Sequence, residues 1–320
     1  MIKLPQKKAV GSAHSKLILV GEHAVVYGKP AIALPFPTIK AQSTVEELPA
    51  IKRTEDLLVD CRYYVGPLEG IPTKLMGIAA CINETLKVLG QQPIGIRIHI
   101  QSSIPIGRGL GSSAAVAIAI VRSLYKYFNQ DLQQDRLMQL VSIAETHAHG
   151  NPSGIDMEAA SSDIPIWFQK NKEIIPLQMK ESLHLVVADT GHVGDTRTAV
   201  EGIRKMYQVN PALTQQSLDI LEKVTYSAKE ALVTGNVEQL GSTMNQAQHE
   251  LTKLGVSDHS INRLVQTARH HQALGAKLTG GGLGGCVIAL AKNEQHATTL
   301  ADAMRDAGAY ETWHFQTAGN

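Results

Sequence analysis

Short apolar stretches of this sequence predict three β-strands. Residues 15–20 read Ser-Lys-Leu-Ile-Leu-Val, and residues 94–101 carry isoleucine at every second position. Strict alternation of this kind places the isoleucines on one face of a strand. Residues 183–188 form a third apolar stretch of strand length.

Helical spacing takes over between and after these strands. Residues 113–128 are rich in small and aliphatic side chains, and residues 133–149 place apolar side chains at helical intervals: Leu137, Leu140, Val141, Ala144 and Ala148. Both segments predict helices packed on a sheet. Residues 197–271 are amphipathic, and the chain closes with a strand, a glycine loop, a strand, a helix and a strand. The predicted fold class is therefore α+β.

The length of 320 residues favours two domains over one. The segment 163–182 is polar and contains proline, so we place the boundary near residue 176, with domains at 1–176 and 177–320. No low-complexity linker separates the halves, which predicts a tight interface that could hold a substrate cleft.

The composition argues against several classes of protein. Thirty basic and 29 acidic residues, without a basic cluster and with 4% aromatic residues, are not typical of a nucleic-acid binder. The three cysteines include no CxxC pair, and the 13 histidines include no HExxH, so we expect neither a disulfide framework nor a zinc site. No apolar run reaches membrane-spanning length and the N-terminus does not resemble a secretory signal. We expect a cytoplasmic protein that does not bind membranes.

The segment Pro105–Ala115 carries the clearest functional signal. It reads Pro-Ile-Gly-Arg-Gly-Leu-Gly-Ser-Ser-Ala-Ala and lies between a predicted strand and a predicted helix. Alternate glycines let the backbone approach an anion closely, and the helix N-terminus beyond them favours phosphate. The alternative is a tight turn in which Ser112 or Ser113 only caps the helix. The segment fits neither a Walker A loop nor a dinucleotide fingerprint.

This segment matches the PxGxGLGSSAA motif of the GHMP kinases, which the sequence resembles over nearly its whole length. Two further family motifs are matched by the segments 16–28 and 277–286. The resemblance implies a ribosomal-protein-S5-like N-terminal domain, a ferredoxin-like C-terminal domain, ATP as phosphoryl donor and Mg²⁺ as cofactor. The residues that it assigns to nucleotide binding are Ser102, Gly107, Arg108, Gly109, Leu110, Gly111, Ser112 and Ser113.

Two carboxylates follow the glycine loop. Glu145 lies at the edge of the apolar stripe of its predicted helix, so it requires a partner, which is either a structural cation or a metal ion. The family resemblance favours metal binding and assigns Ser113 and Glu145 to Mg²⁺. Asp156 is either a first-turn acid favoured by the helix dipole or a group that accepts the proton of a substrate hydroxyl.

The resemblance pairs Asp156 with Lys16 as the catalytic residues. Phosphoryl transfer through a loose transition state requires little base catalysis, so the sequence leaves open whether Asp156 is a base or orients the hydroxyl. Either role predicts severe loss of activity on mutation.

The segment Gly21-Glu-His-Ala-Val-Val-Tyr-Gly28 resembles most the branch of the family that phosphorylates the primary hydroxyl of mevalonate. This resemblance assigns Glu22, His23 and Thr196 to the substrate, whereas capping is the preferred role for Asp195. The run of glycines at 280–285 predicts close backbone approach to the phosphate loop. Family members are often dimers, so a homodimer is possible.

Three alternatives remain at this stage. The alternative most similar to the preferred function is another GHMP kinase, which acts on phosphomevalonate or homoserine. A dinucleotide-binding oxidoreductase is disfavoured because the third glycine of its fingerprint is replaced by Ser112. A non-catalytic sensor built on a kinase fold is disfavoured because Lys16, Glu145 and Asp156 are all present.

Overall fold

The computed structural model describes residues 7–49, 57–150 and 153–319 of the chain. It divides into two compact units, each assembled from separate stretches of sequence. The first unit contains residues 1–15, 39–105 and 111–161, and the second contains residues 16–38, 106–110 and 162–320. The two N-terminal strands and the glycine loop therefore pass from one unit into the other.

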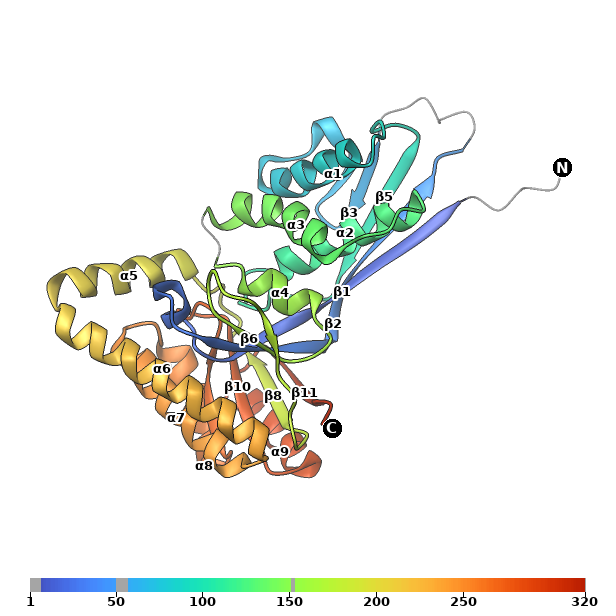
Figure 1. Ribbon diagram of the computed structural model, residues 1–320. Helices are drawn as coiled ribbons and strands as arrows, with labels where there is room; N and C mark the ends of the chain where they lie inside the picture. Colours follow the sequence, from blue (N-terminus) through green and yellow to red (C-terminus); the bar gives the residue numbers. More distant parts are fainter. Residues whose placement is uncertain (1–6, 50–56, 151–152, 320) are drawn as a thin grey trace. The chain divides into compact units, whose positions relative to one another are not determined.

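A β-sheet underlies the first unit (Figure 1). Its strand β5 (Ile96–Ser102) runs parallel to β3 (Leu58–Cys61) and antiparallel to the later part of β2 (Ala31–Glu47). β4 (Tyr64–Pro67) pairs with β3, and β1 (Lys8–Val20) pairs with β2. The three isoleucines of β5 are buried and the residues between them are not, which confirms the predicted alternation.

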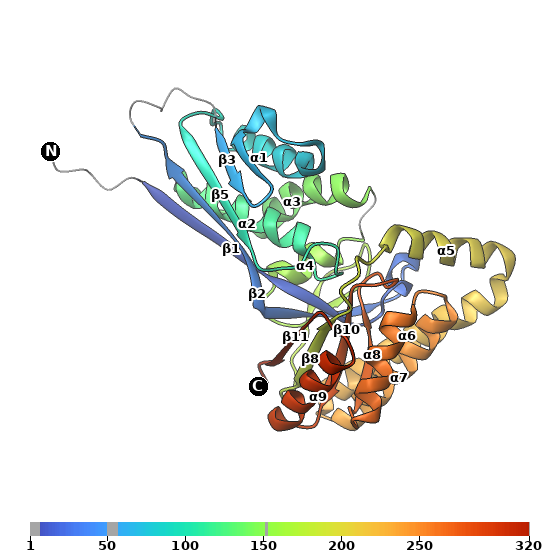
Figure 2. The same cartoon turned by 180° about the vertical axis from the view of Figure 1, so that it is seen from behind.

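Helices cover one face of this sheet in both views (Figures 1 and 2). They are α1 (Met76–Val88), α2 (Ser112–Tyr127), α3 (Gln134–His149) and α4 (Ile155–Ser161), with short 3-10 turns η3 (Leu68–Gly70) and η4 (Thr73–Leu75) before α1. α2 is the central helix, since it contacts α1, α3, α4 and β5. Gly11 on β1 permits this packing, because a Cβ there would lie 2.3 Å from the carbonyl oxygen of Ala119 on α2.

The second unit is built on a four-stranded antiparallel sheet in the order β11-β8-β10-β9. These strands are β8 (His184–Asp189), β9 (Gly275–Thr279), β10 (Cys286–Ala291) and β11 (Glu311–Gln316). β9 and β10 are buried along their whole length, so neither shows an alternating pattern: β10 is continuously apolar, and β9 also buries the polar side chains of Lys277 and Thr279. The short strand β6 (Ile166–Phe168) pairs with the first residues of β2 and with β7 (Ile175–Pro176).

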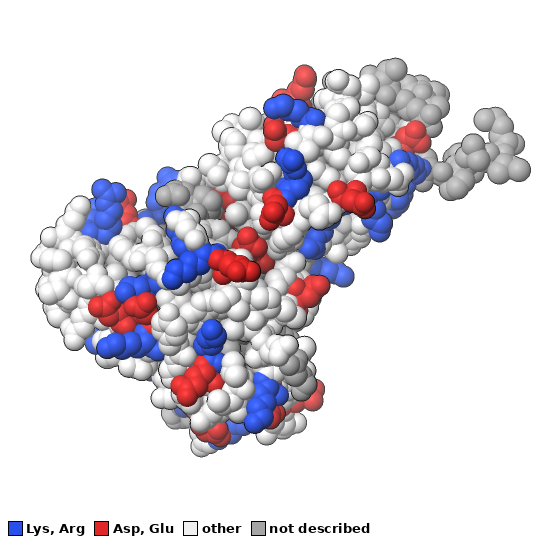
Figure 3. Space-filling view, viewed as in Figure 1, with Lys and Arg blue, Asp and Glu red and all other residues white. Residues whose placement is uncertain are grey.

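Five α-helices lie in the described part of the second unit. They are α5 (Thr196–Val209), α6 (Pro211–Thr234), α7 (Val237–Lys253), α8 (His259–His270) and α9 (Glu294–Asp306). α6 and α7 pack along each other, α7 and α8 pack on β9, and α9 packs on β8 and β11. Lys and Arg side chains are interspersed with Asp and Glu on the face shown in Figure 3. None of the described helices combines the length and the apolar character needed to cross a membrane.

Most of the elements predicted from the sequence are present. The predicted helices at 113–128 and 133–149 correspond to α2 and α3, and the predicted strand at 183–188 corresponds to β8. β2 was not predicted, because its two prolines break the strand pattern. They lie between the part of β2 that pairs with β6 and the part that pairs with β5. The single boundary near residue 176 stays a prediction, since the two units described here are discontinuous in sequence.

Candidate functional site

Backbone hydrogen bonds within the second unit hold the predicted phosphate loop as far as Leu110. Gly107 and Gly109 have φ angles of 71° and 75°, a region that side chains rarely adopt. The amide of Gly194 donates to the carbonyl of Gly107 at 2.7 Å, and the amide of Lys16 donates to that of Leu110 at 3.3 Å. Contacts on both sides therefore fix the course of the loop.

The side chain of Lys16 also lies on this loop. Lys16 is 1% exposed on β1, and its Nζ donates to the carbonyl oxygen of Gly109 at 2.8 Å. The structure thus brings the predicted catalytic lysine together with the predicted phosphate loop. A cation fixed at this place favours a negatively charged group beside it.

The second glycine run packs backbone to backbone against the phosphate loop, which confirms the prediction for residues 280–285. A Cβ added at Gly280 would lie 2.8 Å from the Cα of Gly109, and one at Gly285 would lie 3.0 Å from the carbonyl oxygen of Arg108. The first distance is too short for a Cβ and the second leaves almost no room for one, and both residues have positive φ angles, 82° and 80°, so both positions favour glycine.

We expect Gly280→Ala to weaken nucleotide binding about 10-fold or more, because the new methyl group would displace Gly109. Gly255→Ala is the matched control, since Gly255 also has a positive φ, 74°, but has no atom within 4 Å of the added Cβ. Both variants carry the backbone strain of about 1–2 kcal/mol. Calorimetric titration with a non-hydrolysable ATP analogue distinguishes them, and equal affinities would contradict the prediction.

The side chain of Arg108 is directed at the C-terminal sheet. Its Nε donates to the carboxylate of Asp189 at the end of β8 at 2.9 Å, and its Nη2 donates to the carbonyl of Gly191 at 2.9 Å. Asp189 is buried, and Nη1 of Arg108 has no hydrogen-bond partner among the described residues. The guanidinium therefore anchors the loop, and a role of Arg108 in nucleotide binding stays a prediction.

Glu22 forms a fully buried ion pair with Lys277 on β9. The side chains of both residues have 0% exposure. Burial raises the pKa of Glu22 and lowers the pKa of Lys277, and the direct contact of the two charges opposes both shifts. The second carboxylate oxygen of Glu22, Oε2, has no hydrogen-bond partner among the described residues. That oxygen is the part of Glu22 still available to another donor.

His23 has a strained backbone at the start of the 3-10 helix η1 (Ala24–Tyr27). Its φ and ψ angles are 61° and −45°, which is uncommon for a residue with a side chain. The imidazole is 5% exposed, and its Nε2 donates to the carbonyl oxygen of Gly281 at 3.0 Å. Burial lowers the pKa of His23 to about 4, so the ring is neutral near pH 7. With the proton on Nε2, Nδ1 of the ring is an acceptor.

This buried histidine predicts a loss of stability in mild acid. Between pH 6.5 and about 4 the unfolded chain protonates His23 while the folded chain does not, so the free energy of unfolding falls as the pH falls. The full decrease in the free energy of unfolding is about 3 kcal/mol, and above pH 6.5 His23 causes no decrease. Urea unfolding of the parent and of His23→Gln at pH 7.5 and pH 5 checks this, since the variant should show a smaller decrease. An equal decrease in both would rule the assignment out.

Thr196 and His23 meet at Gly281. Thr196 is the first residue of α5, and a Cβ added at Gly281 would lie 2.1 Å from its Oγ1. Asp195 caps the helix by accepting from the amide of Thr198 at 2.9 Å, which confirms its predicted capping role. The hydrogen bonds from Thr198 also lower the pKa of Asp195. Two of the three predicted substrate residues therefore contact the same glycine.

The first unit carries the other predicted residues. α2 begins directly after the glycine loop, and its N-cap is Gly111 with φ 73°. No side chain caps this helix, so the capping alternative for Ser112 and Ser113 is wrong and their half-buried side chains are available for other contacts. Ser102, at the end of β5, is exposed and accepts from the amide of Ile104 at 3.1 Å.

Glu145 and Asp156 lie on neighbouring helices of the first unit. Glu145 is 1% exposed on α3, which packs on α2, and Asp156 is half-buried in the first turn of α4. Within the described ranges, no group of three or more His, Cys, Asp or Glu side chains could hold a metal ion. A metal site at Glu145 would therefore need hydroxyl and ligand oxygens. The predicted pairing of Asp156 with Lys16 stays a prediction.

Three positioning residues were missed from the sequence. Lys277 was noticed only as part of a motif, although a lysine in an otherwise apolar strand is a signal for a buried acidic partner. Asp189, at the end of a strand, gives no comparable signal. Thr279 was also missed, and its hydroxyl donates to the carbonyl and accepts from the amide of Ile18 on β1, each at 3.0 Å. These contacts join segments about 260 residues apart.

Comparisons with known proteins agree with this geometry. Residues 75–162 match the model of the GHMP kinases N terminal domain, and residues 228–309 match that of the GHMP kinases C terminal domain. The chain is 35% identical to a mevalonate kinase of Pyrococcus furiosus, over 94% of both chains.

It also resembles two solved structures at 26% identity. The structure of L. major mevalonate kinase in complex with R-mevalonate gives a TM-score of 0.83, covering 99% of this chain and 97% of that one. The structure of Methanococcus jannaschii mevalonate kinase gives 0.79, covering 96% of both chains.

Proposed function

Because the chain belongs to the GHMP kinases, and within them to the mevalonate kinase family, we propose that it transfers the γ-phosphoryl group of ATP to the primary hydroxyl of mevalonate. The products are 5-phosphomevalonate and ADP, and the hydroxyl proton is released. The observation that carries the proposal is the cluster in the second unit, where Lys16 and the glycines of 280–285 both contact the loop at Gly109. The α+β fold expected from the sequence is that of this family.

The loop from Gly107 to Ser113 is the proposed site of the ATP phosphates. Its glycines leave the backbone accessible, and the uncapped N-terminus of α2 offers amide groups to an anion. Lys16 adds a buried positive charge at Gly109. The chain therefore supplies positioning and positive charge, which are the main requirements of phosphoryl transfer.

Ser113 and Glu145 are the proposed protein ligands of Mg²⁺. A hydroxyl and a buried carboxylate are the oxygen donors that this ion prefers, and a site with few protein ligands leaves room for phosphate oxygens. When bound, the ion neutralises charge that develops on the phosphates. Glu145 lies on α3, which packs on α2, the helix that begins at Ser112 and carries Ser113.

The substrate end of the proposed site contains Glu22, His23 and Thr196. His23 presents a neutral acceptor at Nδ1, Glu22 has one carboxylate oxygen without a partner among the described residues, and Thr196, an exposed residue, carries a hydroxyl. These groups suit a small molecule with several hydroxyls. Asp156 is the proposed group that accepts or orients the reacting hydroxyl proton. The oligomeric state and the cellular compartment stay predictions.

The test is ADP release by the purified protein with Mg-ATP and, separately, mevalonate, phosphomevalonate or homoserine. We expect turnover with mevalonate only, with one phosphorylated product formed per ADP as seen by mass spectrometry. Turnover with one of the other substrates would keep the reaction class and overturn the substrate. Silence with all three would overturn the kinase proposal itself.

A further inference from the structure

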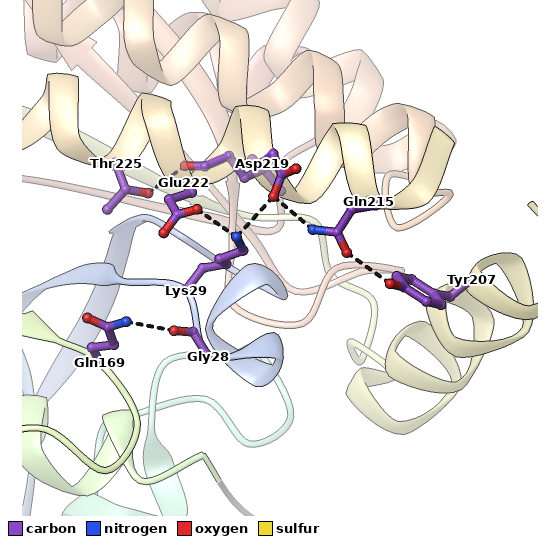
Figure 4. Close-up of polar contacts among 9 residues, drawn as sticks. Gly28, Lys29, Gln169, Tyr207, Gln215, Asp219, Glu222 and Thr225 are labelled. Atoms are coloured by element: carbon purple, nitrogen blue, oxygen red, sulfur yellow. Dashed lines mark hydrogen bonds and ion pairs between the residues drawn. The ribbon is translucent and has the colours of Figure 1, made fainter. Parts of the chain in front are cut away.

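The turn that carries His23 is fastened to α6 by Lys29 (Figure 4). Nζ of Lys29 contacts the carboxylates of Asp219 at 2.9 Å and Glu222 at 2.6 Å. The lysine side chain is 21% exposed, so the contact is partly shielded from solvent. Gln169 binds the same turn from the other side, because its Nε2 donates to the carbonyl oxygen of Gly28 at 2.8 Å.

The same turn is also joined to α5. The rings of Tyr27 and Tyr207 are stacked, with centroids 6.1 Å apart and planes 16° apart. The hydroxyl of Tyr207 donates to Oε1 of Gln215 at 2.9 Å, and Nε2 of Gln215 donates to Asp219 at 2.8 Å. Figure 4 shows how Gln215 connects the tyrosine to the acidic side chain that Lys29 binds. The contacts therefore form one connected set.

α5 has few other contacts that fix its position. Among its residues only Ala199 and Ile203 are buried, and its contacts with other elements are mainly with α6. Its first residue, Thr196, lies against Gly281, and His23 binds the carbonyl of that glycine. Tyr207 lies near the other end of the helix. A shift of the Tyr207 end would therefore move Thr196 relative to His23.

We propose that Tyr27, Lys29 and Tyr207, called the brace below, are positioning residues that set the affinity for mevalonate by holding Thr196 and His23 together at Gly281. The inference rests on the proposed function, because that function assigns Thr196 and His23 to the binding of mevalonate. The brace touches neither the phosphate loop nor Lys16 in the contacts described. Its effect is therefore on the binding of mevalonate and not on that of ATP.

Tyr207→Ala tests the brace by removing both the stack and the hydrogen bond to Gln215. We expect KM for mevalonate to rise about 2- to 10-fold, the range of an aromatic stack, with kcat and KM for ATP unchanged. Tyr226→Ala is the matched control, because it removes a tyrosine of α6 outside the brace, whose ring is tilted against that of Trp167 with centroids 5.0 Å apart. The double variant of Tyr27→Ala and Tyr207→Ala should add little to either single change.

Hydrogen exchange of the α5 amides supplies a readout that does not depend on turnover. A rise in KM for mevalonate together with faster exchange in Tyr207→Ala supports the proposal. Faster exchange with an unchanged KM overturns it, because the brace would then be structural only. A parallel loss of kcat and of ATP affinity also overturns it, because the unit would have loosened as a whole. Turnover of mevalonate by the parent is measured first, so a failure of the proposed function is separated from a failure of the brace.

Discussion

Asp156→Asn should lower kcat for mevalonate by about 10²- to 10⁴-fold, the range of a positioned acid or base group. Asparagine keeps the size and the hydrogen-bonding ability of the side chain and removes its negative charge. KM for mevalonate should change little, because the interaction that is lost develops in the transition state. Steady-state measurement of ADP release at saturating ATP gives both constants.

Asp135→Asn is a suitable control, since Asp135 is an exposed first-turn acid on α3. It should leave kcat within twofold of the parent. A kcat for Asp156→Asn that stays close to that of the parent would exclude Asp156 from the reaction.

The predicted partnership of Asp156 with Lys16 is tested by a double-mutant cycle. If the two residues act as a unit, Lys16→Met combined with Asp156→Asn should be hardly slower than the slower single variant. If the effects of the two single substitutions on kcat instead multiply, Lys16 acts independently of Asp156, on the phosphate loop where its Nζ contacts Gly109. The measurement is again kcat at saturating ATP.

The sequence predicted those parts of the fold that depend on local pattern. Helical spacing predicted α2 and α3, and alternation predicted β5. The two runs of glycine predicted segments where backbones approach each other closely, because glycine has no side chain to prevent it. β2 could not be predicted in this way, because its continuity depends on two different neighbouring strands. The division into units is likewise a product of tertiary contacts, which return residues 16–38 and 106–110 to the second half of the chain.

The site was predicted only as far as motifs and family resemblance reached. They assigned roles to Lys16, His23 and the glycine loop, which stay predictions, but did not indicate what holds these groups in place. The hydrogen bond of His23 to Gly281, the anchoring of Arg108 by Asp189 and the pairing of Glu22 with Lys277 all join segments distant in sequence. Such contacts leave no periodic signal, because each partner is an isolated polar residue within an otherwise ordinary element.

Lys277→Met should lower the stability of the protein by about 3–5 kcal/mol, because it leaves the carboxylate of Glu22 buried without its counter-ion. The thermal midpoint should fall by on the order of 10 °C. Lys205→Met is the control, because its pair with Glu201 is exposed, 72% and 60%, and should contribute less than about 1 kcal/mol. Urea unfolding at pH 7.5 compares the variants.

The double variant with Glu22→Gln and Lys277→Met distinguishes an ion pair from mere packing. Burial disfavours each charge by itself, so removing both should recover a large part of the stability that Lys277→Met loses. If the double variant is instead as unstable as the sum of the two single changes, the two charges do not stabilise each other. In that case the lysine stem, and not its charge, would be what the core around β9 requires. The double variant should also be less active than the parent even where it is folded, because Glu22 directly precedes His23 and the pair fixes the start of that turn.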